Sequence, residues 1–184
     1  MIVHATAVAR RVGRDWRAAL LFGPSGAGKS DLALRALEGG WRLVSDDYTV
    51  VWLSGGRLWA RAPDTIADRM EARGLGILPV DRLPLAEVVL AAQCGPDAPE
   101  RLPEPETVEV GGRRLPCVRL RAIEASALAK LERALSTRAL PAEAGSAYLG
   151  PSRERRREVP DATAETDPGF SGPGSLGRSK RQAG

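Results

Sequence analysis

The sequence predicts an α/β fold in which helices flank a mixed sheet. A continuous apolar run at residues 18–22 leads directly into a glycine-rich segment and then into a stretch with helical periodicity. Other short apolar runs are joined by glycine-rich turns, which is typical of hairpins. The composition, with 43% hydrophobic and 27% charged residues, is that of a globular protein with a buried core.

The amino-terminal part is predicted to contain two strands, a loop and a helix. Residues 2–8 are expected to form the first strand. Residues 18–22 are all apolar, which is typical of a strand buried on both faces. The helix expected over residues 29–38 ends at the glycine pair 39–40, because glycine favours the end of a helix. The apolar residues that share one face of this helix are Leu32, Ala33, Ala36 and Leu37.

The rest of the body is expected to add strands, hairpins and a long helix. Residues 54–56 and 111–112 are glycine-rich turns that predict two hairpins. Residues 66–71 are predicted to form a short helix, residues 74–78 a strand or turn, and residues 122–140 a long helix. The expected strands are residues 41–44, 48–53, 57–60, 88–91, 108–110 and 115–118.

The chain divides into one domain and a tail. Residues 1–149 hold all the predicted elements, so they are expected to form a single domain. Residues 150–184 consist mainly of Pro, Gly, Ser and charged residues. The tail has few large apolar side chains, and their burial cannot offset the loss of conformational entropy on ordering. We therefore expect a disordered low-complexity tail.

Composition excludes several classes of function. The net charge is +4, but the only dense basic run is at residues 153–157, and 4% aromatic residues give few surfaces for base stacking, so we expect no nucleic-acid partner. No run approaches the roughly 20 apolar residues of a membrane-spanning helix, so we expect no membrane insertion. Cys94 and Cys117 fit no metal-ligand spacing or disulfide framework, and the start lacks a leader pattern. These features favour a cytoplasmic location.

Residues 23–30 match the phosphate-binding pattern G-x-x-x-x-G-K-S/T at every fixed position. Glycines allow backbone N–H groups to face phosphates, and the start of the helix adds partial positive charge. The lysine is expected to reach the β and γ phosphates, and the serine hydroxyl to bind Mg²⁺. The sequence therefore predicts binding of a nucleoside triphosphate with Mg²⁺. The residues predicted to form this site are Gly23, Pro24, Ser25, Gly26, Ala27, Gly28, Lys29 and Ser30.

Other candidate residues have a functional and a structural interpretation. Asp46 and Asp47 follow a predicted strand; on an extended segment they would point to opposite sides, one toward a metal and one toward an attacking hydroxyl. They fit a solvated turn as well. His4 is the only histidine, and half-buried packing is its default interpretation. Glu71 and Arg73, before the Gly-x-Gly at residues 74–76, fit either metal and phosphate contacts or a surface turn.

Together, four segments resemble the catalytic domain of the HPr kinase/phosphorylase family over residues 2–125. They are the strand that carries His4 and residues 20–31, 42–47 and 71–77. The resemblance implies an α/β, P-loop-containing kinase-like fold. It also implies ATP- and Mg²⁺-dependent phosphorylation of a serine on an HPr-like phosphocarrier protein of the phosphotransferase system.

The same resemblance assigns roles to individual residues. The chain is similar to a short form of the family that lacks the amino-terminal domain. Residues 116–122 match the family's segment for the reverse phosphorylase reaction only loosely, so phosphorylase activity is left open. Assembly into a homo-oligomer is left open as well. The implied catalytic residues are His4, Lys29, Asp47 and Arg101, and the implied metal-binding residues are Ser30, Glu71 and Asp46.

Two alternatives to a protein kinase remain. The first is a catalytically silent nucleotide-binding module that regulates a protein partner. The second is a kinase for a small molecule, which leaves the segment at residues 73–76 unexplained. Transfer of phosphate to a carrier protein distinguishes the protein kinase from both alternatives.

Overall fold

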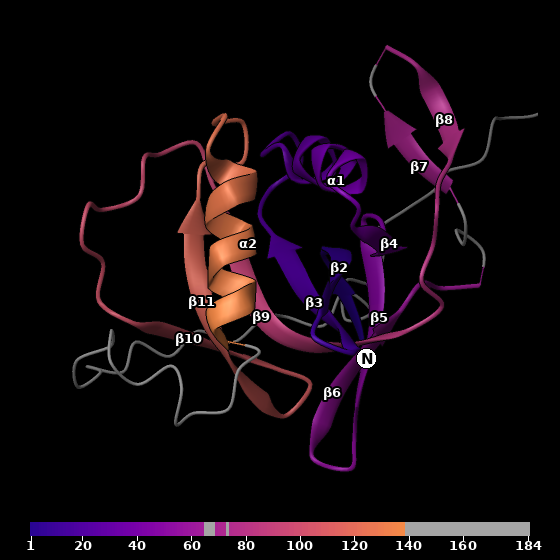
Figure 1. Ribbon diagram of the computed structural model, residues 1–184, viewed down its shortest axis with the longest axis horizontal. Helices are drawn as coiled ribbons and strands as arrows, with labels where there is room; N and C mark the ends of the chain where they lie inside the picture. Colours follow the sequence, from indigo (N-terminus) through magenta and orange to yellow (C-terminus); the bar gives the residue numbers. More distant parts are fainter. Residues whose placement is uncertain (65–68, 73, 139–184) are drawn as a thin grey trace, which may run out of the picture.

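The computed structural model describes residues 1–64, 69–72 and 74–138, in which a curled mixed sheet carries two helices (Figure 1). The predicted α/β class is confirmed. The elements, in chain order, are β1 (Ile2–His4), β2 (Thr6–Val12), β3 (Asp15–Phe22), α1 (Lys29–Glu38), β4 (Arg42–Ser45), β5 (Tyr48–Ser54), β6 (Arg57–Arg61), β7 (Arg69–Ala72), β8 (Gly76–Pro79), β9 (Ala86–Cys94), β10 (Glu106–Val110), β11 (Arg113–Leu120) and α2 (Ala127–Arg138).

Strand β9 organises the sheet. One of its edges pairs in parallel with β3. Its other edge pairs with β6 near its start and in parallel with β11 near its end. The main path runs in the order β1-β5-β6-β9-β3-β2-β4, with β10 and β11 branching from β9. The hairpins β5–β6 and β10–β11 form at the predicted glycine-rich turns.

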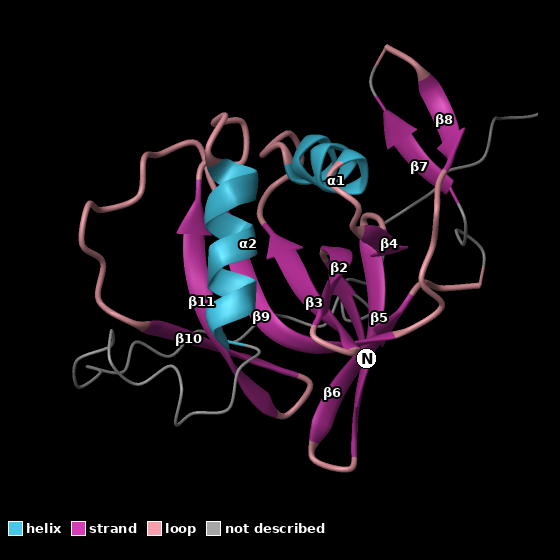
Figure 2. Ribbon diagram, viewed as in Figure 1, coloured by secondary structure: helices cyan, strands magenta, loops and turns pink. Residues whose placement is uncertain are grey.

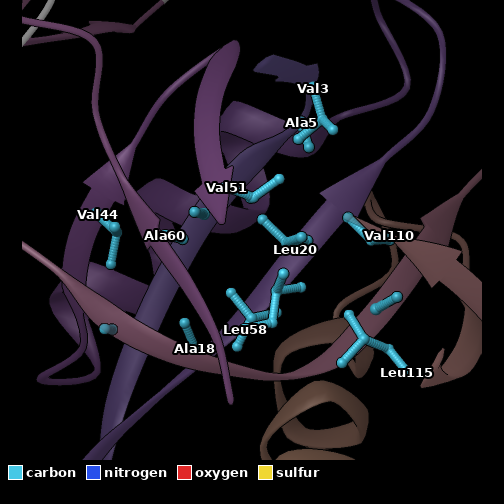
Figure 3. Packing of buried hydrophobic residues seen from close by; sticks show 14 of the residues in the cluster. Val3, Ala5, Ala18, Leu20, Val44, Val51, Leu58, Ala60, Val110 and Leu115 are labelled. Atoms are coloured by element: carbon cyan, nitrogen blue, oxygen red, sulfur yellow. The ribbon is translucent and has the colours of Figure 1, made fainter. Parts of the chain in front are cut away.

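Two apolar clusters lie on opposite faces of the sheet. Both helices pack on the same face, where Leu32 of α1 and Leu131 and Leu135 of α2 are fully buried together with Leu21 of β3 (Figure 2). The buried residues of the other cluster come from the strands and from Ala5, which lies between β1 and β2, and none comes from a helix, because the sheet curls over itself (Figure 3). Its members shown in Figure 3 include Val3, Leu20, Val51, Leu58, Val110 and Leu115.

Strand directions bring four loops to one edge of the sheet. Strands β3, β9 and β11 are mutually parallel, and β2 is antiparallel to both β3 and β4, so β4 runs in the same direction as β3. The segments that follow these strands therefore leave from the same edge, where ligands of α/β proteins usually bind. These segments are residues 23–28, 46–47, 95–105 and 121–126.

Several predicted boundaries are wrong. Residues 69–71 belong to strand β7, not to a helix, since β7 pairs with β8 and Met70 is buried against the α1 side of the sheet; residues 65–68 lie outside the described part. The predicted strand 2–8 is two strands that pair with different partners, β5 and β3. Helix α2 begins at Ala127, because residues 121–126 form hydrogen-bonded turns.

The predicted tail, residues 150–184, and the end of the predicted catalytic domain, residues 139–149, lie outside the described part of the chain. Within the described residues, no helix has the length and apolar character needed to cross a membrane.

Candidate functional site

The glycine-rich loop connects β3 to α1 and depends on left-handed backbone geometry. The φ angles of Gly23, Gly26 and Gly28 are 146°, 81° and 86°, a region that favours glycine. The backbone N–H of Ala27 donates to the carbonyl of Pro24 at 3.1 Å and closes a turn. The loop thus has the backbone conformation that the sequence pattern requires.

Gly23 also has no room for a side chain. A Cβ at this position would lie 2.3 Å from the backbone carbonyl oxygen of Cys94, in the adjacent strand β9. We expect Gly23→Ala to lower the free energy of unfolding by about 3 kcal/mol or more, since backbone atoms must move. Urea denaturation tests this result. The control is Gly26→Ala, where φ is also positive but the space is open, so a loss of only about 1–2 kcal/mol is expected. Equal losses would show that the contact with Cys94 does not matter.

Lys29 begins helix α1 and turns its side chain back toward the loop. The residue is 6% exposed. Its Nζ donates to the carbonyl oxygens of Gly23 at 2.8 Å and Pro24 at 3.1 Å. The ammonium group is therefore held against the backbone of the glycine-rich loop.

Asp46 gathers hydrogen-bond donors from three parts of the chain. Its Oδ1 accepts from Thr6 Oγ1 at 2.8 Å, from Ser30 Oγ at 3.1 Å and from the backbone N–H of Asp47 at 3.1 Å. Thr6 is fully buried in β2, and Ser30 lies in the first turn of α1. The carboxylate thus connects the end of β4 to the phosphate-binding loop, and the structure brings the two predicted metal-binding residues Asp46 and Ser30 together.

Asp47 points toward His4 and solvent. Its Oδ1 lies 3.0 Å from His4 Nε2, and the aspartate side chain is 66% exposed. The His4 ring lies beside Tyr48, with ring centroids 5.4 Å apart. The two aspartates were expected on an extended segment. They form a bend instead, in which Asp47 has a φ of 64°. This bend, and not strand alternation, is what directs the two carboxylates to different partners.

Two predicted site residues lie apart from this cluster. Glu71 is exposed on the hairpin β7–β8. Arg101 is exposed and belongs to the loop at residues 95–105. This loop lies on the other side of α2 from β4 (Figure 1). Within the described residues, no hydrogen bond joins either side chain to Asp46, and no group of three or more His, Cys, Asp or Glu forms a metal cluster.

Sequence reasoning missed the role of Thr6. A buried hydroxyl in an apolar strand needs a partner, and Thr6 finds it in Asp46, which lies 40 positions later in the chain. The sequence spacing could have indicated this role. Thr6 stands two residues after His4 in an extended segment, so its side chain faces the same side as that of His4.

Cys94 lies next to the loop, and its buried thiol stays protonated at neutral pH. Burial raises the pKa of its thiol from 9.0 to about 11, and the nearby charge of Lys29 opposes the rise. The unfolded chain loses this proton near pH 9, whereas the folded chain keeps it up to about pH 11. The stabilising effect is therefore complete below about pH 9 and is lost as the pH rises toward 11.

The loss should amount to about 2–3 kcal/mol of unfolding free energy. We expect the urea midpoint of the native protein to fall more steeply above pH 9 than that of Cys94→Ala, which has no thiol to ionise. Parallel curves for the two proteins would contradict this assignment.

The structure therefore belongs to the class of α/β proteins with a strand, a glycine-rich loop and a helix at the carboxyl edge of the sheet. Residues 18–92 match the model of the family described as HPr Serine kinase C-terminal domain. This segment contains most of β3, the loop, α1 and the aspartate pair. The chain is HPr kinase-like, as the resemblance of its motifs implied.

Curated relatives and a solved structure agree with this result. The chain is 42% identical to the HPr kinase/phosphorylase of Clostridium beijerinckii over 64 residues, which are 35% of the chain and 21% of the relative. It is 43% identical to that of Brevibacillus brevis over 60 residues, 32% of the chain and 19% of the relative. The match thus spans about a fifth of each relative's length. The HPr(Ser) kinase/phosphatase structure from Coxiella burnetii has the same fold, with a TM-score of 0.59, 20% identity and coverage of 73% of this chain and 91% of that chain.

Proposed function

We propose that the protein binds ATP with Mg²⁺ on residues 23–30 and transfers the γ-phosphoryl group to a serine of an HPr-like phosphocarrier protein in the cytoplasm. The observation that carries this proposal is the convergence of the phosphate-binding loop with Asp46, Asp47 and His4 at one edge of the sheet. The names of the matched relatives support the choice of acceptor.

The proposed transfer assigns a role to each side chain. The serine oxygen forms a bond to the γ phosphorus while the bond from that phosphorus to the bridging oxygen of ADP breaks. The serine proton passes to the carboxylate of Asp47, which is exposed and therefore open to a protein acceptor. His4 holds that carboxylate in place. Lys29 and the backbone N–H groups of the loop stabilise the charge on the phosphoryl oxygens.

The donor atoms beside the loop fit Mg²⁺. Asp46 Oδ1 and Ser30 Oγ lie 3.1 Å apart, and carboxylate and hydroxyl oxygens are the ligands that this ion prefers. Mg²⁺ commonly binds through one or two protein carboxylates and keeps several waters, so a cluster of three acidic residues is not required. When bound, Mg²⁺ supplies positive charge to the phosphate oxygens. Glu71 is the further metal-binding residue, and Arg101 the further catalytic residue, that the family resemblance proposes.

The experiment is transfer of label from γ-labelled ATP with Mg²⁺ to a purified HPr-like carrier protein. A carrier in which alanine replaces the acceptor serine is the matched control. We expect label on the serine carrier alone. Nucleotide binding without label on either carrier would overturn the kinase and favour the regulatory module, and absence of nucleotide binding would overturn both.

A further inference from the structure

We propose that the turn at residues 121–124, with the exposed side chain of Ile123, is the subsite that receives the nucleoside part of bound ATP. The inference rests on the proposed function, since it concerns the part of the nucleotide that the phosphate-binding loop does not hold. It deepens that function by naming what would distinguish ATP from inorganic triphosphate.

The order of the strands sets the direction of the nucleotide. The loop at residues 23–28 follows β3, near the middle of the sheet. Asp46 and Asp47 follow β4, which is separated from β3 by β2, whereas the turn 121–124 follows β11, which is separated from β3 by β9 on the opposite side. Figure 1 shows α1 between β4 on one side and β11 with α2 on the other. A nucleotide whose γ phosphate faces the aspartates therefore extends its nucleoside toward the turn.

The turn touches the loop directly. A Cβ at Gly28 would lie 3.0 Å from Ile123 Cγ2 and 3.3 Å from Ala122 Cβ, so these two side chains lie against the start of α1. The backbone N–H of Gly95 donates to the carbonyl of Leu120 at 3.0 Å, which ties the ends of β9 and β11 together. The turn is thus next to the position where phosphates are expected, because its side chains lie directly beside Gly28 of the loop.

The turn is also held rigidly. Arg35 of α1 donates to the carbonyl oxygen of Ala122 and, at 3.2 Å, to that of Glu124. Asp31 fixes the same guanidinium through an ion pair of 2.8 Å. Within the turn, the N–H of Glu124 donates to the carbonyl of Arg121 at 2.9 Å. A surface that is ordered in advance binds a ligand without the entropic cost of ordering that surface.

Ile123 supplies the chemistry of the subsite. The residue is 62% exposed although it sits on this rigid turn beside the phosphate-binding loop. Sites for small molecules combine apolar side chains with a few polar groups, and an aliphatic side chain suits the flat face of a base or the carbon edge of a ribose. The phosphates would thus be held by the loop, and the nucleoside by Ile123.

The test compares two ligands on the full chain: Mg²⁺-ATP and inorganic triphosphate with Mg²⁺, each titrated by calorimetry. We expect Ile123→Ala to weaken ATP binding about tenfold and to leave triphosphate binding within about twofold. Ile123→Val, which keeps a branched side chain, should retain ATP affinity within about twofold. The matched control is Leu53→Ala, an exposed apolar residue of the β5–β6 hairpin, which should change neither affinity.

The outcomes separate this subsite from the proposed function. If the unchanged protein binds neither ligand, the proposed function fails, and the subsite with it. If the protein binds both ligands but Ile123→Ala leaves ATP affinity unchanged, the subsite is overturned while the proposed function stands. Equal weakening of ATP and triphosphate would show that Ile123 only supports the loop at Gly28, and would also overturn the subsite.

Discussion

The Asp47→Asn variant is expected to transfer phosphate to the carrier about 100- to 10,000-fold more slowly than the unchanged protein, the range that a general base contributes. Asparagine cannot accept the serine proton at neutral pH, but it has the size of aspartate and tolerates the left-handed backbone found at this position, where φ is 64°. Nucleotide affinity should stay within about threefold, because Lys29 and the loop are unchanged. Rates of label transfer and calorimetric titration with Mg²⁺-ATP measure the two effects.

The control for this variant is Asp15→Asn. Asp15 is also 66% exposed and also contacts a basic side chain, that of Arg17, but it lies at the start of β3, the end opposite the loop. Its replacement should leave transfer unchanged. Normal transfer by Asp47→Asn would remove Asp47 from the role of base, whereas loss of both transfer and nucleotide binding would point to a damaged loop.

Predictions that depended on local sequence signals were accurate for most elements near the phosphate-binding loop and for the two hairpins. The apolar run before the loop, the helix at Lys29–Glu38 and the two hairpins all form as expected, because glycine conformations, helical periodicity and hairpin turns are determined by a few neighbouring residues. The sequence placed Asp46 and the phosphate-binding loop at the same edge of the sheet, and the structure joins Asp46 to Ser30 there. Both residues lie at the ends of elements that a strand, loop and helix unit brings to one edge.

Features that depend on distant pairing were not accessible in this way. Strand β7 has a local pattern that suits a short helix, but its partner β8 and the burial of Met70 select the strand. The break at Ala5 exists because β1 and β2 pair with different strands. The hydrogen bond of Thr6 to Asp46 and the left-handed backbone of Asp47 likewise depend on how β2 meets the end of β4.

Lys29→Met is expected to abolish measurable transfer and to weaken Mg²⁺-ATP binding by at least about thirtyfold, because it removes a buried charged donor from the site of the phosphates. Methionine keeps most of the length of the side chain, so the buried stem of Lys29, 6% exposed, stays packed. Binding by calorimetry measures the effect. The rise of the melting temperature with Mg²⁺-ATP gives a second readout, since a ligand stabilises only a protein that binds it.

The contacts of Lys29 also predict a cost to the loop itself. Without Nζ, the carbonyl oxygens of Gly23 and Pro24 lose their donor, so Lys29→Met should melt at a lower temperature even without nucleotide. Arg57→Met is the control, since this exposed arginine of β6 pairs with Glu87 near the start of β9, at the end of the sheet opposite the loop, and should affect neither binding nor transfer. Full ATP affinity in Lys29→Met would mean that the ammonium group stays with the loop carbonyls when the nucleotide binds. The phosphates would then be held by backbone N–H groups alone.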